Sequence, residues 1–218
     1  YVPYISAGIV SSGTHQLSEW SMVSLISRFQ YSYDDRYMLT ATLRRDGSSR
    51  FGKKNKWGTF PSVSLGYNIS EESFMESVDF INVLKIRASY GVAGNNQIGN
   101  YAHIALLETA NYVANNAKVI GLVPSTLSND DLTWEKSKQM NFGLDMAVFN
   151  ERISLTADIY KDNKVDLLLQ AKLPSASGFT SAMLNVGEIE NKGFELNLNT
   201  VNIRTRKFEW NSNFTFST

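Results

Sequence analysis

The sequence predicts an all-β fold, an antiparallel up-and-down transmembrane β-barrel of which these 218 residues form a part. Three observations predict it. Apolar and polar residues alternate over long segments, the connections between those segments alternate in length, and Tyr and Phe, which favour pleated surfaces, are abundant. We therefore expect residues 1–218 to belong to one barrel domain.

About nine strands are expected, because apolar side chains recur at every second residue and so share one face. Leu84, Ile86 and Ala88, for example, alternate with Lys85 and Arg87. The predicted strands cover residues 1–10, 17–33, 36–45, 58–69, 83–93, 133–149, 152–170, 186–203 and 207–217. Only one short helix is expected, near residues 70–77, with Ser70 as its cap.

The connections between the predicted strands alternate in length from the second strand onward. Short or compact connections cover 34–35, 70–82, 150–151 and 204–206, and long ones cover 46–57, 94–132 and 171–185. Outer-membrane barrels have short periplasmic turns and long extracellular loops, so the long connections are expected to face outside. An open sheet would leave two unpaired edges in the bilayer, so we expect further strands to complete the barrel.

Composition excludes several classes of function. Lys plus Arg and Asp plus Glu both total 21, so no nucleic-acid partner is expected. Without cysteine there is no disulfide or thiolate site, and no apolar run is long enough for a transmembrane helix. His15 and His103 are far apart, and no nucleotide-binding or nucleophile motif is present. We predict no catalytic residue, no metal ligand and no cofactor.

Several motifs occur in an order that identifies a family. They are Arg45-Asp46-Gly47-Ser48-Ser49-Arg50-Phe51-Gly52, then Trp57-Gly58-Thr59-Phe60-Pro61-Ser62, Leu84 to Gly91, Gly94 to Tyr101, Leu132 to Lys136, and Asn185 to Glu195. This ordered set, which spans roughly residues 40 to 200, resembles SusC/RagA-type TonB-dependent transporters of the Bacteroidota outer membrane.

The resemblance implies a concrete function. Such proteins have a 22-stranded barrel with an internal plug, of which this chain would supply about nine strands. They pair with a SusD-like surface lipoprotein that covers the extracellular mouth, and they import oligosaccharides or peptides with energy from TonB. The plug and the N-terminal domains have no counterpart here, so TonB would act through the missing plug region. The resemblance also suggests a dimer of transporter–lipoprotein pairs, surrounded by outer-membrane lipid.

Six residues in or beside the long loops are candidates for contact with the substrate or the lid. They are Arg45, Arg50, Asn95, Asn96, Tyr101 and Tyr112. Each has a structural alternative. The arginines could pair with acidic residues or extend to the membrane edge, the asparagines could only shape the loop, and the aromatic rings could settle at the membrane interface.

Two other functions remain open at this stage. A soluble all-β carbohydrate-binding or adhesin module would bury its apolar stripes in a sandwich core and would need no detergent. An enzyme carried on a barrel would need a catalytic constellation that the sequence does not show. The basic run Lys53-Lys54-Asn55-Lys56 could contact lipopolysaccharide phosphates or form a solvated loop tip.

Overall fold

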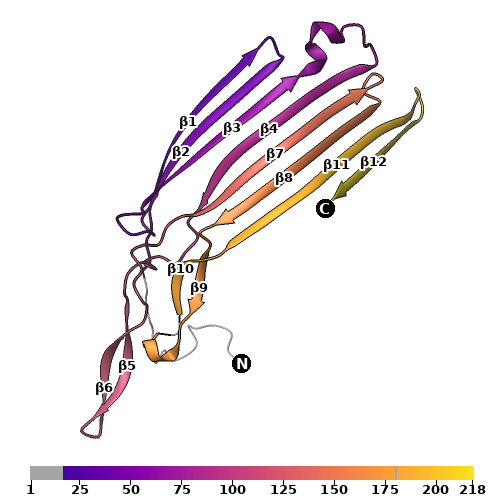
Figure 1. Cartoon of the computed structure of the whole chain (residues 1–218). Coiled ribbons are helices and arrows are strands. Elements are labelled where there is room, and N and C mark those ends of the chain that lie inside the picture. The colour runs from indigo at the N-terminus through magenta and orange to yellow at the C-terminus, as the bar shows by residue number, and fades with distance from the viewer. Residues whose placement is uncertain (1–16, 180) are drawn as a thin grey trace, which may run out of the picture.

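The computed structural model describes residues 17–179 and 181–218 and has one main antiparallel sheet (Figure 1). Its strands lie in the order β1-β2-β3-β4-β7-β8-β11-β12. Their bounds are β1 (Met22–Tyr33), β2 (Tyr37–Ser48), β3 (Trp57–Asn68), β4 (Ile81–Asn95), β7 (Glu135–Val148), β8 (Ile153–Val165), β11 (Glu188–Arg204) and β12 (Glu209–Ser217). The predicted antiparallel up-and-down sheet is confirmed. The predicted strand at 1–10 lies outside the described residues.

Each strand has one apolar and one polar face, and the registers keep these faces continuous across the sheet. One row runs from partner to partner through Tyr37, Tyr67, Ile86, Leu144 and Ala157. The apolar residues of this face are largely exposed, Phe142 by 52% and Ile159 by 59%. In Figure 1 the main sheet is a single layer, with no second sheet against either face. We call the apolar face outward, because a barrel of this kind turns its apolar side to lipid and its polar side to the lumen.

The short turns lie together at one end of the sheet, and the long connections lie at the other (Figure 1). Asp34 and Asp35 join β1 to β2 with two successive positive φ angles of 55° and 51°. Two left-handed residues match the twist of the flanking strands, and Asp tolerates that conformation. This turn therefore sets the register of the first hairpin.

Two of the predicted loops contain strands of their own. Within 94–132, β5 (Leu107–Ala114) and β6 (Ala117–Pro124) form a separate hairpin, which projects away from the sheet in Figure 1. Within 171–185, β10 (Ser181–Asn185) pairs with β9 (Leu168–Lys172). The single strand expected at 152–170 is therefore wrong: β8 ends at Val165, and Asp166 then takes a φ of 58° that breaks the extended chain.

The helix expected near 70–77 appears as two 3₁₀ turns, η2 (Ile69–Glu71) and η3 (Ser73–Met75). A third, η4 (Ser175–Ser177), lies between β9 and β10. Ser70 does not cap the first turn. Its hydroxyl instead donates to Asn68 Oδ1 at 2.9 Å and accepts the Leu84 N–H, which ties the turn to the start of β4. Among the described residues, no helix is both long and apolar enough to cross a membrane.

Candidate functional site: the loop base and the inner wall

A buried apolar cluster joins the long connections at their base. It comprises Phe51, Phe60, Ile98, Leu132 and Trp134, each no more than 5% exposed. Phe51 comes from the β2–β3 connection, Ile98 follows β4, and Leu132 and Trp134 precede β7. The Trp134 ring lies 5.1 Å from that of Phe51 and 5.4 Å from that of Phe60. Connections that are distant in sequence therefore share one small core, which we call the loop-base cluster.

Two glycines make room for the Phe60 ring in this cluster. A Cβ at Gly94 or at Gly58 would overlap the Phe60 ring. Both are on strands next to or containing Phe60, so the ring lies flat across the bare backbone. This is a close approach that a larger residue could not permit. The glycines of the recognised motifs thus have a packing role at the loop base.

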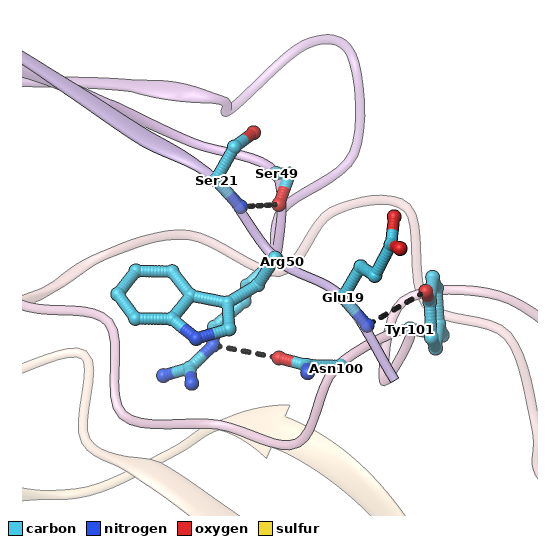
Figure 2. A pocket seen from close by; sticks show the side chains of 7 residues that line it. Glu19, Ser21, Ser49, Arg50, Asn100 and Tyr101 are labelled. Atoms are coloured by element: carbon cyan, nitrogen blue, oxygen red, sulfur yellow. Dashed lines mark hydrogen bonds between the residues drawn. The ribbon is translucent and has the colours of Figure 1, made fainter. Parts of the chain in front are cut away.

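A small open cavity lies beside the loop-base cluster and brings several polar and aromatic side chains together. Its volume is about 280 Å³. It is lined by Glu19, Trp20, Ser21, Ser49, Arg50, Asn100 and Tyr101, all of which are drawn as sticks in Figure 2. The chain before β1 forms one side, and the connections after β2 and β4 form the other. We call this cavity the loop-base pocket.

Arg50 connects the two sides of the loop-base pocket. Its Nε donates to Asn100 Oδ1 at 3.0 Å and its Nη1 donates to the carbonyl oxygen of Asn96 at 3.2 Å (Figure 2 shows the first). The guanidinium also lies 4.5 Å from the centre of the Trp20 ring, a cation–π arrangement. His103 Nδ1 is 3.0 Å from the Arg50 carbonyl oxygen. The two hydrogen bonds use two of the five N–H donors of the guanidinium to fix the loops, and the other three are left for a ligand in the pocket.

The remaining walls of the pocket are held by hydrogen bonds between its two sides. The Ser21 N–H donates to Ser49 Oγ at 2.8 Å, and the Glu19 N–H lies 3.3 Å from the Tyr101 hydroxyl (Figure 2). Tyr101 has a φ of 67°, which turns its ring toward the chain before β1. A cation, a carboxylate, hydroxyl groups and two aromatic rings in one open cavity suit a polar ligand with apolar faces.

The structure brings three of the six candidate residues together. Arg50 and Tyr101 line the loop-base pocket, and Asn96 accepts from Arg50 while its side chain donates to Ser48 Oγ at 3.0 Å. Asn95 is one residue away at the end of β4. Its amide donates to Glu135 Oε1 and its Oδ1 accepts the Gln97 N–H, which shapes the loop.

The other two candidates lie elsewhere. Arg45 is on the outward face of β2, where its guanidinium stacks over the Trp57 ring at 5.3 Å. Tyr112 is 68% exposed on the projecting β5–β6 hairpin and lines no part of the loop-base pocket.

The inner wall carries a second polar group near the middle of the sheet. Arg87, Gly143 and Asp158 face each other in one row across β4, β7 and β8. The Arg87 side chain donates to Asp145 at 2.7 and 3.0 Å and reaches over Gly143 to Asp158 at 3.2 Å. A Cβ at Gly143 would lie 2.5 Å from Asp158 Oδ1, so the glycine is what allows Arg87 to bridge two strands.

A third polar group lies at the short-turn end. The hydroxyls of Tyr37 and Tyr67 donate to Glu72 Oε1 at 2.8 and 3.0 Å, and the two rings stack 5.1 Å apart. The hydrogen bond from Tyr37, together with that from Tyr67 and the charge of Arg36, holds the pKa of the Glu72 carboxyl below its ordinary value. This group fastens the β3–β4 connection to the first hairpin.

Sequence reasoning missed Glu19, Trp20 and Asn100 as pocket residues. Glu19 and Tyr101 are 82 residues apart, and the sequence around each of them does not predict their contact. No group of three or more His, Cys, Asp or Glu side chains in the described part of the chain could hold a metal ion. His15 lies outside that part.

Comparisons with known proteins place this geometry in one group. A family model described as TonB dependent receptor-like, beta-barrel, matches residues 6–218. The chain is 42% identical to the TonB-dependent receptor P39 of Formosa agariphila, covering 94% of this chain and 19% of that protein. It is 38% identical to the TonB-dependent receptor SusC of Bacteroides thetaiotaomicron, covering 89% and 20%. The chain thus spans about a fifth of the length of these curated relatives.

Solved structures of TonB-dependent transporters have the same arrangement of strands as this chain. The structure of the RagAB peptide transporter superposes with a TM-score of 0.86 at 34% identity, covering 98% of this chain and 24% of that one. The siderophore receptor PirA from Acinetobacter baumannii superposes with a TM-score of 0.60 at 15% identity, which shows a shared fold alone.

Proposed function

The chain belongs to the TonB-dependent receptor family, as part of its β-barrel, and on that premise we propose that it forms part of the wall of a nutrient transporter in the bacterial outer membrane. One observation carries the proposal: a single-layered sheet with an exposed apolar face and a continuous polar face. Lipid covers the first face, and the second lines the lumen. A soluble binding module would need another layer over Phe142 and Ile159, and the shared family counts against it.

The substrate class that we propose is supported by relatives that match most of this chain at substantial identity. RagAB, which is a peptide transporter, matches almost the whole chain, and SusC is a receptor of the same family. We therefore assign import of peptides or oligosaccharides to the whole protein. Its role is transport and not catalysis. The plug and its TonB contact would lie in the part of the protein outside residues 1–218.

The loop-base pocket is the part of this chain that would meet the substrate or the lid. It opens at the end of the sheet that carries the long connections, which we place outside the cell. There Arg50 and Tyr101 offer a cation and an aromatic ring, and the backbone carbonyl oxygen of Asn96 holds Arg50 in place. The β5–β6 hairpin projects beyond this end and would contact a SusD-like lipoprotein, with two transporter–lipoprotein pairs in the full assembly.

The inner-wall group of Arg87, Asp145 and Asp158 would face the lumen or the plug. One guanidinium pairs with two carboxylates in this group, so the group keeps one net negative charge on the polar face. A polar wall of this kind keeps the passage wet while the outer face stays apolar.

The experiment is to extract the full-length protein from isolated outer membranes and to measure uptake by cells that lack it. We expect a detergent-dependent chain several times longer than 218 residues, which co-purifies with a lipoprotein, and a loss of peptide or oligosaccharide uptake on deletion. Recovery as a water-soluble protein outside the outer membrane would overturn the proposal.

A further inference from the structure

Basic side chains lie at the same edge of the apolar band on several strands of the outward face. On four strands the first outward side chain beyond the apolar residues, toward the long-connection end, is basic. These are Arg45 of β2, Lys138 of β7, Lys161 of β8 and Lys192 of β11. Between the short turns and these cations, every outward side chain on those four strands is uncharged. We call the four cations the basic belt.

The four cations of the basic belt do not lie in one row of paired residues. Each lies at the edge of the apolar band on its own strand. Arg45 stands eight residues along β2 from Tyr37, and Lys161 stands eight residues along β8 from Ile153. The row that contains Tyr37 meets β8 at Ala157, so β8 as a whole is displaced toward the short-turn end. Tilted strands of a barrel are displaced in this way. The cations are therefore at similar depths relative to the membrane.

Three lysines of the belt lie close together on neighbouring strands. Lys161 and Lys192 are direct partners across β8 and β11. Like charges in that position repel. Glu190 is placed between them, with its carboxylate 2.8 Å from Lys161 Nζ and 3.9 Å from Lys192 Nζ. Lys138 on β7 adds a third ammonium group in the row of Asn163 and Glu190. Glu188 lies on the same face of β11 and accepts from Asn163 at 2.7 Å, so three lysines face two carboxylates and a small excess of positive charge remains.

The other end of the apolar band differs. The outward residues there are Tyr33, Tyr37 and Tyr67, with their rings arranged side by side. At the belt end, the Arg45 guanidinium lies over the Trp57 ring, and Lys53 and Lys54 are exposed in the connection between β2 and β3. The band is thus bordered by aromatic rings on one side and by cations on the other.

We propose that the basic belt binds the phosphate groups of the glycolipid headgroups in the outer leaflet of the membrane. The proposal rests on the proposed function, because that function puts the long connections outside. The belt continues the lipid-facing apolar surface and faces away from the lumen, so its partner is a lipid headgroup and not the transported substrate. Lysine and arginine attract anionic headgroups at this depth.

The test uses the full-length transporter purified from outer membranes in mild detergent. Native mass spectrometry would count bound lipid A as phosphorylated lipid A is titrated, with dephosphorylated lipid A as the second ligand. The belt variant combines Lys138→Gln, Lys161→Gln and Lys192→Gln. The matched control combines Lys85→Gln and Lys164→Gln, on the inner face, with Lys118→Gln on the hairpin, and so removes the same charge elsewhere.

We expect the belt variant to bind phosphorylated lipid A at least ten-fold more weakly than the control, since one lysine near an anionic surface is worth about five-fold. Both variants should bind dephosphorylated lipid A alike, and lysine-to-arginine substitution at the three positions should restore binding. Equal affinity of the belt variant and the control for phosphorylated lipid A would overturn the inference. Failure of the proposed function looks different: the unmodified protein would then be missing from the outer membrane altogether.

Discussion

Replacing Trp134 by alanine should loosen the long connections without unfolding the sheet. Trp134 is 2% exposed and contacts two aromatic rings, and its indole N–H donates to the Lys56 carbonyl oxygen at 3.3 Å. Removing a buried tryptophan from a core of this kind costs about 3–5 kcal/mol. The loop-base cluster holds connections from three parts of the chain, so that cost should appear as easier local opening of those connections.

Hydrogen exchange measured by mass spectrometry on the full-length protein in detergent would show this. A loss of about 3–5 kcal/mol corresponds to roughly 140-fold to 4,000-fold faster exchange where local opening limits the rate. The increase should cover residues 49–56, 96–104 and 129–133 together, because all three segments contact the cluster. Exchange near the β7–β8 turn should remain unchanged.

Trp57→Ala is the matched control. Trp57 is the same residue type in the same part of the sheet, but it is 49% exposed on the outward face. It should leave protection of the three segments nearly intact. If Trp134→Ala left their exchange unchanged, or if Trp57→Ala accelerated it equally, the idea of a shared loop base would be refuted.

Two further predictions concern other parts of the sheet. Gly94→Ala should lower the unfolding temperature in detergent, because its Cβ would overlap the Phe60 ring and overpacking costs about 1–3 kcal/mol; Gly99→Ala, whose Cβ would meet nothing within 4 Å, should not. The hydrogen bond from Tyr37 lowers the pKa of the Glu72 carboxyl in the folded protein. The ionised carboxylate therefore stabilises the fold fully at a pH above its ordinary pKa of 4.5, and this stabilisation is lost as the pH falls from 4.5 through the lowered pKa. Glu72→Gln should remove that step from a series of thermal melts, and a step that persists in the variant would contradict the assignment.

The strands of the main sheet were predictable because each has one face toward a different environment. Segments such as Tyr37 to Leu43 alternate apolar and polar residues without a break, so the sequence shows both that a strand is present and which of its side chains share a face. The β5–β6 hairpin was not recognised, since its strands pair only with each other and need no strict alternation. Asn115 and Asn116, at φ angles of 51° and 56°, form its turn and were the available signal.

The candidate site was only partly predictable. Arg50, Asn96 and Tyr101 were found because they belong to motifs beside long loops, and the structure brings them together. Arg45 shares the same motif with Arg50 but points outward, which strand parity alone would have shown. Trp20 joins the site through a contact with Arg50 that local sequence does not encode.

The central claim is that this chain is a membrane wall with its long connections outside the cell. It is tested most directly by labelling intact cells with a membrane-impermeant maleimide. Residues 1–218 contain no cysteine, so a single one can be placed in the full-length protein at Lys54 or Asp35, with any other cysteine replaced. The account predicts labelling at position 54 in intact cells and at position 35 only after the outer membrane is opened. Labelling of both positions in intact cells, or of position 35 alone, would contradict it.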